Sequence, residues 1–306
     1  MQTGHPKARR PCASIMMPNN GPTLQGQHAV YNRSYCKDPG CREQAVKIQV
    51  HGHRGARALF PENTLPAFEY AIDAGADALE LDLAVTKDNI VVVSHDPVLH
   101  PPICCGPAPE AVIRELTLAQ IGEWDCGAMQ NPAFPRQRTI KGTRMPTLDQ
   151  VLGLAPIGDF LFDLEMKIFA EHPELAPSPE EFVQLVLTLI RKHSLESRVI
   201  FQSFDFRPLH VMKRLAPGIQ LAALYEGSPK EFSAIAQESG ARTVAPEYRL
   251  VTPSRVRAAH AAGLSVLTWT PNTPEEWDRL MEAGVDGIIT DDPALLLAHL
   301  GRTVRP

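Results

Sequence analysis

The segment from His51 to His95 reads HGHRGARALFPENTLPAFEYAIDAGADALELDLAVTKDNIVVVSH, and the rest of the predicted fold is arranged around it. A short apolar run leads into the histidines at its start. A helical stretch separates this run from a second one, which carries Glu80 and Asp82. Because side chains alternate along a strand, these two carboxylates point to the same face. Paired carboxylates near histidines and an arginine indicate a metal site that handles an anion.

The composition is that of an ordinary globular protein. The 306 residues are 44% hydrophobic and 21% charged, with a formal net charge of −5. This charge argues against a nucleic-acid partner. No apolar run approaches the roughly 18 residues that a transmembrane helix needs. The apolar piece after Arg9 and Arg10 is too short for a signal peptide, so we expect a cytoplasmic protein, or a periplasmic or secreted one if the start is misassigned.

From Val46 onward, strand-like runs alternate with helical ones. The predicted strands are 46–53, 77–83, 159–166, 198–204, 219–225, 241–246, 264–270 and 285–290. The predicted helices are 64–75, 147–154, 179–193, 207–215, 229–239, 253–262, 274–283 and 293–300. This alternation predicts a (β/α)8 TIM barrel over 46–306. A doubly wound sheet is the alternative, although its Gly-rich first turn is not seen. Residues 1–45, rich in Pro, Gly, Asn and Gln, are predicted to form a disordered or loosely packed extension.

The residues after Leu83 turn back too soon for a crossover helix, which needs a dozen or more residues. Asp88 and Asn89 form a plausible two-residue hairpin turn. Such a turn would place Asp82 opposite His95. The sequence therefore predicts a hairpin after the second strand that carries a histidine to the carboxylate pair.

A long insertion, residues 97–146, follows the hairpin and is rich in Pro and Gly. A loop of this length is typical of a lid or substrate wall. Its Cys104 and Cys105 are expected to be free thiols, because six cysteines are too few for a disulfide scaffold at this length. Cys36 and Cys41 could pair or belong to a metal knuckle, but no matching pair follows at zinc-site spacing.

Active sites of such barrels lie at the carboxyl ends of the strands. The polar or aromatic residues predicted there are His51, His53, Arg54, Glu80, Asp82, Glu165, Lys167, Gln202, Ser203, Trp269, Asp291 and Asp292. Three of these carboxylates, Glu80, Asp82 and Glu165, can surround a hard divalent cation. Arg54 and Lys167 supply positive charge for a phosphate, and two histidines can exchange protons near neutral pH. This combination suits phosphoryl transfer.

At these positions the sequence resembles the glycerophosphodiester phosphodiesterase family, which has a phospholipase-C-like barrel. The resemblance runs from about Val46 to Ala294. It rests on the ordered set HRGARALFPENTLPAF, ALELDLAVTKDNIVVVSHD, RMPTLDQVL, FDLEMK, FQSFD, LTWTPN and GVDGIITDDP. The extension and the insertion with its adjacent Cys104 and Cys105 depart from the family pattern.

The resemblance implies hydrolysis of a glycerophosphodiester to sn-glycerol 3-phosphate and an alcohol, with water or the substrate's own hydroxyl as nucleophile. His53 and His95 would be the acid/base pair. Glu80, Asp82 and Glu165 would bind Mg²⁺ or Ca²⁺. Arg54 and Lys167 would contact the phosphate with Glu62 close by, and Trp269 would wall the glycerol side. We expect a monomer or homodimer acting on a small molecule.

Several alternatives stay open at this point. Asn63 or Thr64 can cap the first helix, and Asn63 can instead contact a ligand. Asp291 and Asp292 are expected to cap the last helix, which Pro293 opens. A lysophospholipase D-type activity fits the same barrel. A metal-dependent amidohydrolase would use His51 and His53 but needs histidines ending the fifth and sixth strands. A non-catalytic phospho-ligand-binding module is the remaining alternative.

Overall fold

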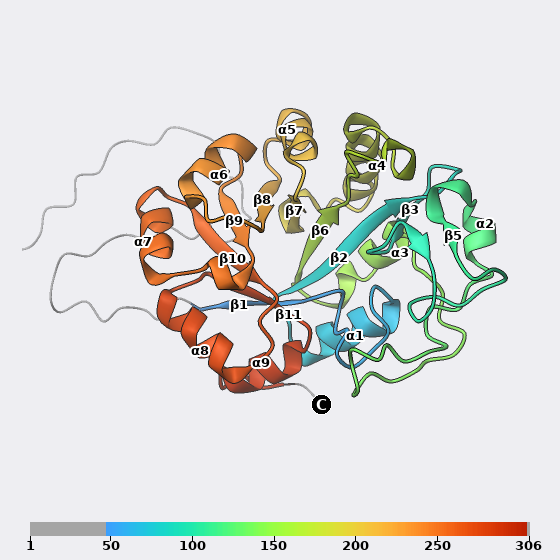
Figure 1. The fold of residues 1–306 in the computed structure, drawn as a ribbon, viewed down its shortest axis with the longest axis horizontal. Coiled ribbons are helices and arrows are strands. Elements are labelled where there is room, and N and C mark those ends of the chain that lie inside the picture. Colours follow the sequence, from blue (N-terminus) through green and yellow to red (C-terminus); the bar gives the residue numbers. More distant parts are fainter. Residues whose placement is uncertain (1–46, 305–306) are drawn as a thin grey trace, which may run out of the picture. The chain divides into compact units, whose positions relative to one another are not determined.

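The computed structural model describes residues 47–304. The predictions for residues 1–45, including those for Cys36 and Cys41, lie outside the described residues. Within the described part, eight parallel strands close into a barrel (Figure 1). They are β1 (Gln49–Gly52), β2 (Ala78–Val85), β6 (Leu161–Met166), β7 (Val199–Ser203), β8 (Gln220–Tyr225), β9 (Thr243–Pro246), β10 (Ser265–Trp269) and β11 (Gly287–Thr290). β1 pairs with both β11 and β2, so the sheet has no open edge between them. The predicted barrel is confirmed and the doubly wound alternative is excluded.

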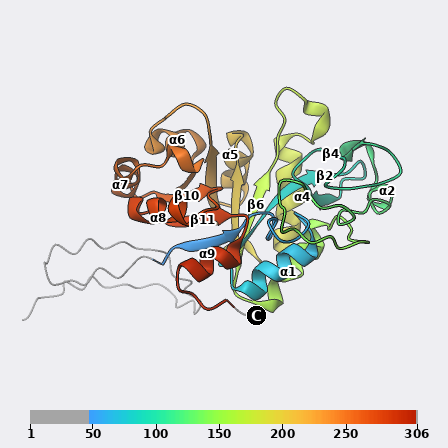
Figure 2. The same ribbon diagram turned by 60° about the horizontal axis from the view of Figure 1, so that its bottom comes forward.

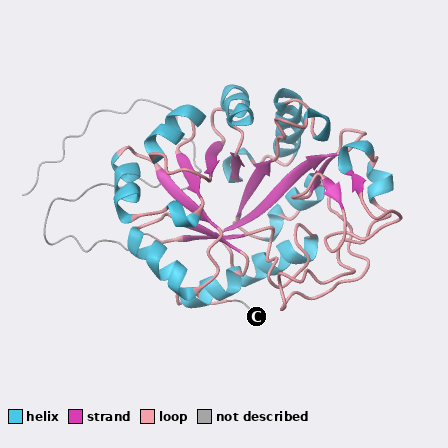
Figure 3. Cartoon of the chain, in the orientation of Figure 1, coloured by secondary structure: helices cyan, strands magenta, loops and turns pink. Residues whose placement is uncertain are grey.

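Helices cover the outside of the barrel, and all eight predicted helices are present (Figure 3). They are α1 (Leu65–Ala74), α3 (Leu148–Leu152), α4 (Pro179–Lys192), α5 (Phe206–Leu215), α6 (Phe232–Ser239), α7 (Pro253–Ala261), α8 (Pro274–Ala283) and α9 (Pro293–His299). Capping boxes at Thr147, Ser178 and Thr273 fix where three of them begin. α9 lies beside α1 in both views (Figures 1 and 2), so the last helix meets the first.

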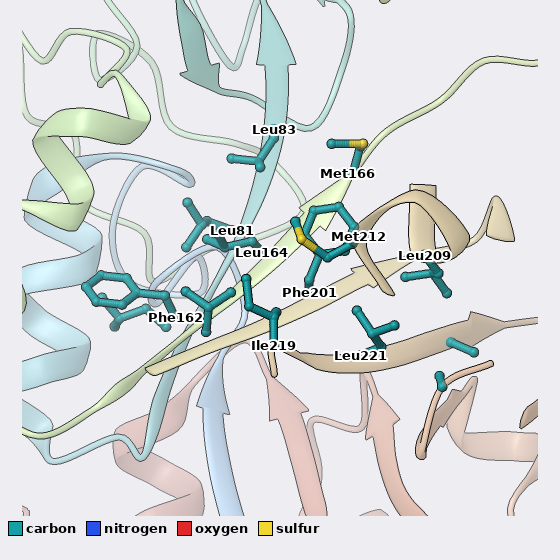
Figure 4. Close-up of a cluster of buried hydrophobic side chains, with 14 of the residues drawn as sticks. Leu81, Leu83, Phe162, Leu164, Met166, Phe201, Leu209, Met212, Ile219 and Leu221 are labelled. Atoms are coloured by element: carbon teal, nitrogen blue, oxygen red, sulfur yellow. The ribbon is translucent and has the colours of Figure 1, made fainter. Parts of the chain in front are cut away.

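The alternation of side chains along the strands separates an outer apolar layer from an inner polar one. The outer row joins register partners on four neighbouring strands: Leu81, Leu164, Phe201 and Leu221. These side chains form an apolar cluster with Leu209 and Met212 of α5 (Figure 4). The row one residue further along points into the barrel: Asp82, Glu165, Gln202 and Ala222. Packing of the outer row against the helices therefore fixes the direction of the inner row.

The predicted hairpin is confirmed, but its predicted register is wrong by one residue. β3 (Val91–Val93) runs antiparallel to β2, with Leu83 opposite Val93. The backbone N–H of Thr86 donates to the carbonyl of Ile90, so the loop between them has three residues. Asn89 in this loop has a left-handed conformation with φ 61°. Asp82 therefore pairs with Ser94, whose N–H donates to its carbonyl at 2.9 Å, and His95 follows just beyond.

The insertion builds a small second core beside the barrel. Its elements are β4 (Val98–Leu99), β5 (Ala111–Val112) and α2 (Leu118–Ile121). The core residues are Val92, Leu99, Cys104, Ile113, Ile121, Trp124, Cys126 and Met145. Paired backbone hydrogen bonds between Cys105 and Asp125 bring two distant segments together.

A disulfide joins Cys104 to Cys126 inside this core, whereas Cys105 is free. The prediction of a free Cys104 is therefore wrong. Its partner lies 22 positions away and is brought near by the backbone pairing of the insertion, which local sequence does not reveal. Among the helices of the described part, none combines the length and the apolar character needed to cross a bilayer.

We expect Cys126→Ser to lower the free energy of unfolding by about 2–4 kcal/mol, because the closed loop no longer restricts the unfolded chain. Urea unfolding of the oxidised protein, followed by circular dichroism, measures this change. The matched control is Cys105→Ser, which removes a neighbouring thiol outside the bond and should unfold near the wild-type midpoint. A wild-type midpoint for Cys126→Ser would contradict the stabilising role.

Candidate active site

Three predicted carboxylates meet at the mouth of the barrel. Glu80 and Asp82 come from β2 and Glu165 from β6, and an oxygen of each lies within 4.8 Å of the others. Glu80 and Asp82 are each 1% exposed, so the barrel wall holds them away from bulk water. Burying like charges this close is costly unless cations compensate them.

The pKa values of the cluster reflect this crowding. Burial and the neighbouring Asp82 carboxylate raise the pKa of Glu80 well above its usual range. Burial also raises the pKa of Glu165. For Asp82 burial acts in the same direction, but the cations of Lys167 and Arg54 outweigh it and hold the pKa well below the usual range. Oxygen donors with excess negative charge fit a hard divalent cation such as Mg²⁺ or Ca²⁺.

Two cations contact the carboxylate cluster. The ammonium nitrogen of Lys167 lies 3.0 Å from Asp82 Oδ1 and 2.5 Å from Glu165 Oε1. The guanidinium of Arg54 lies 3.3 Å from Asp82 Oδ2 and donates to Glu62 Oε1 at 2.5 Å. The atom of Arg54 that faces Asp82 is the buried Nε, which pairs with this carboxylate but makes no regular hydrogen bond. Two carboxylates therefore hold this guanidinium in place, and its remaining N–H groups can serve an anionic ligand.

The turn between β1 and α1 orients these groups through two residues with left-handed backbones. Arg54 has φ 51°, and its backbone N–H donates to Glu80 Oε2 at 2.9 Å. Asn63 has φ 56°, and its amide donates to Asp82 Oδ2 at 2.8 Å. Such conformations persist where the surroundings enforce them. Thr64 occupies the cap position of α1, so Asn63 is a carboxylate contact rather than the cap.

His53 is held by a partner that the sequence did not reveal. Its Nδ1–H donates to Asp291 Oδ1 at 2.6 Å, because a carboxylate can only accept, and Asp291 also accepts from Arg57 Nε at 2.7 Å. His53 Nε2 then lies 3.9 Å from Glu80 Oε2. Burial and the Arg57 cation lower the pKa of His53 to about 4, with Asp291 opposing them. This imidazole is therefore neutral at pH 7.

The two adjacent aspartates have different roles. Asp292 accepts from the backbone N–H of Leu295 at 3.0 Å and caps α9, as predicted. Asp291 instead orients His53, so its prediction as a cap is wrong. The sequence signal was the pair of aspartates at the end of the last strand, where barrel sites lie.

His95 approaches the carboxylates from the hairpin and has an aspartate of its own. Its Nδ1–H donates to Asp96 Oδ1 at 2.8 Å, and Asp96 Oδ2 accepts from His100 Nε2 at 3.0 Å. The hydrogen bond from His95 lowers the pKa of Asp96 to about 2. Ser94, the residue before His95, bonds the backbone of Asp82, and His95 lines a pocket with Asn63, which contacts the Asp82 carboxylate. Both histidines thus keep Nε2 free.

The insertion borders the same place. A pocket is lined by Glu62, Asn63, Ser94 and His95 from the barrel side and by Ile103, Cys104, Cys126 and Met145 from the insertion side. The disulfide therefore lies within the wall next to His95.

A family model of the glycerophosphoryl diester phosphodiesterases matches residues 53–295. The chain belongs to this family. It is thus a phosphoric diester hydrolase, of a family that hydrolyses glycerophosphodiesters. A glycerophosphodiester phosphodiesterase of Caldanaerobacter subterraneus subsp. tengcongensis is 34% identical over 252 residues, 82% of this chain and 97% of that protein. One of Bacillus subtilis is 30% identical over 263 residues, 81% of this chain and 85% of that protein.

Solved structures agree with the barrel of this phosphodiesterase. A protein of Silicibacter pomeroyi has a TM-score of 0.77 and 32% identity, covering 84% of this chain and 95% of that one. A phosphodiesterase of Oleispira antarctica, in complex with the product sn-glycerol-3-phosphate, has a TM-score of 0.71. It is 23% identical and covers 83% of this chain and 96% of that one, which shows a shared fold. The predicted family is therefore confirmed.

Trp269 lies at the end of β10, as predicted. Its indole N–H donates to the carbonyl of Ala245 at 2.8 Å, and Phe204 packs edge-to-face against it with ring centres 5.4 Å apart. Phe204, at the end of β7, is 39% exposed. The phosphodiesterase therefore has an aromatic pair at the ends of two of its strands, and Phe204 was not predicted.

The remaining histidines exclude the amidohydrolase alternative. The nitrogen Nδ1 of His51 lies 2.8 Å from Asp163 Oδ2, and both side chains are fully buried. β8 and β9 end at Tyr225 and Pro246 rather than at histidines. His193 follows α4 and bonds Asp149, whereas His210 lies on α5 and bonds the carbonyl of Glu238.

We expect Asp291→Asn to lower kcat/KM by roughly 10²–10⁴-fold, the usual contribution of a positioned acid or base, because His53 would lose the carboxylate that sets its tautomer. The steady-state hydrolysis of glycerophosphocholine measures this change. Asp292→Asn is the matched control, because asparagine caps a helix as well as aspartate does. Equal rates for the two variants would show that the hydrogen bond to His53 has no catalytic consequence.

Proposed function

We propose that the chain hydrolyses glycerophosphodiesters to sn-glycerol 3-phosphate and an alcohol at a divalent cation. Glu80, Asp82 and Glu165 would hold Mg²⁺ or Ca²⁺, and His53 and His95 would act as the acid/base pair. The grouping of three buried carboxylate oxygens within 4.8 Å is the observation that carries this proposal. The product seen with the Oleispira antarctica phosphodiesterase supports the choice of substrate class.

Phosphate binding is assigned to Arg54 and Lys167. When bound, the cation would supply further positive charge for the phosphoryl oxygens. The guanidinium of Arg54 is held beside Asp82 at 3.3 Å, and its fork of donors matches phosphate geometry. Glu62 accepts from the other end of the same guanidinium and fixes its direction. The phosphate would then lie between the two cations, next to the carboxylate cluster.

Proton transfer is assigned to the two free Nε2 atoms. One imidazole would take the proton of the attacking hydroxyl or water, and the other would protonate the departing alkoxide. Each ring is fixed through its Nδ1–H by an aspartate, Asp291 for His53 and Asp96 for His95. This tautomer is required if Nε2 is to accept a proton.

The walls of the site suggest how the substrate is oriented. Trp269 would wall the glycerol side, with Phe204 extending the aromatic surface. The insertion, through Ile103 and Met145, would wall the side of His95. Its disulfide favours an oxidising compartment, so a periplasmic or secreted location is favoured over the cytoplasmic one.

The test is turnover of glycerophosphocholine, glycerophosphoethanolamine and a lysophospholipid by the purified chain, with and without EDTA. We expect release of sn-glycerol 3-phosphate from the small diesters, loss of activity in EDTA, and recovery with Mg²⁺ or Ca²⁺. Turnover that persists after exhaustive chelation would contradict the metal role. Release of a lysophosphatidate in preference to glycerol phosphate would favour the lysophospholipase D-type alternative, and binding without turnover would favour the phospho-ligand-binding module.

A further inference from the structure

We propose that Gln202 is a fourth, neutral oxygen ligand of the cation held by Glu80, Asp82 and Glu165. The inference rests on the proposed metal site and extends it to a third strand, β7. Mg²⁺ takes about six oxygen ligands and Ca²⁺ about six to eight, so three carboxylates leave room for neutral donors.

The strand register aims Gln202 at the cluster. Gln202 of β7 is the register partner of Glu165 on β6, and Glu165 is the partner of Asp82 on β2. Register partners on neighbouring parallel strands point to the same face of a sheet. Phe201, one residue earlier, packs in the outer apolar cluster (Figure 4), so the side chain of Gln202 must point into the barrel.

The amide oxygen of Gln202 is buried without a hydrogen-bond partner from the protein. The residue is 1% exposed, and its Oε1 has no hydrogen-bond partner. Leaving a buried acceptor unsatisfied destabilises the folded protein. The next residue in the same row is Ala222, whose methyl group offers no partner. A cation next to Glu165 would satisfy this oxygen.

A neutral donor suits the charge of the site. Three carboxylates already place an oxygen each within 4.8 Å of one another, so negative charge is concentrated there. A fourth carboxylate would add to this repulsion, whereas an amide oxygen completes the ligand set without adding charge.

The experiment measures binding of Mg²⁺ and of Ca²⁺ alone, without substrate, by isothermal titration calorimetry on the metal-free full chain. We expect Gln202→Met, which keeps the length and removes the amide, to bind each cation roughly 10–100-fold more weakly than the wild type. Gln202→Asn, which withdraws the oxygen by one methylene, should also weaken binding. Gln202→Glu keeps an oxygen at this position and should bind each cation more tightly than Gln202→Met does, although the added charge repels the other carboxylates.

Two further variants separate the possible failures. Gln220→Met makes the same change at an exposed position of β8 and should bind like the wild type. Glu165→Gln tests the three carboxylates themselves. If the wild type binds no cation, or if this variant binds the cation as tightly as the wild type does, the proposed metal site is contradicted. If Glu165→Gln weakens binding but Gln202→Met and Gln202→Asn bind like the wild type, the Gln202 inference alone is overturned. An unfolded Gln202→Met, detected by circular dichroism in EDTA, leaves the decision to Gln202→Asn and Gln202→Glu.

Discussion

Three carboxylates buried together at one end of a barrel impose the constraint that organises this structure. Isolated in an apolar interior, such a cluster would be too costly to keep charged. Here Lys167 and Arg54 lie against it, and a backbone N–H and an amide satisfy further oxygens. Lys167 directly follows β6, and the other partners lie in the turn after β1. The electrostatics of the cluster therefore connect β2, the end of β6 and this turn. A divalent cation would supply the remaining positive charge.

The barrel gathers residues that are far apart in the chain. His53 follows β1, whereas its partner Asp291 follows β11, 238 positions later. Closure of the sheet through β1 and β11 makes them neighbours, and the backbone N–H of His53 bonds the carbonyl of Thr290. His95 follows β3, the second strand of the hairpin. The first strand of this hairpin is β2, which carries Glu80 and Asp82. The two imidazoles therefore come from different parts of the barrel mouth. Each ring is oriented by a hydrogen bond to an aspartate.

Most of the fold could be predicted from the sequence, because alternating strands and helices carry strong periodic signals and caps. The carboxylate grouping followed from spacing and strand order. The hairpin register could not be fixed, because a three-residue loop with Asn89 in a left-handed conformation looks like a two-residue turn. Cys126 was missed as a partner because a disulfide depends on how the insertion folds. Asp291 was misread because Asp-Asp-Pro is also a helix-start signal, and only closure of the barrel brings it to His53.

The central claim is that these carboxylates bind a divalent cation at the barrel mouth. Anomalous diffraction from crystals soaked in Mn²⁺, which takes the same oxygen ligands as Mg²⁺, tests it most directly. We predict one strong anomalous peak in contact with Glu80, Asp82 and Glu165. A well-ordered barrel with no peak at these oxygens, or with manganese bound only elsewhere, would contradict the account.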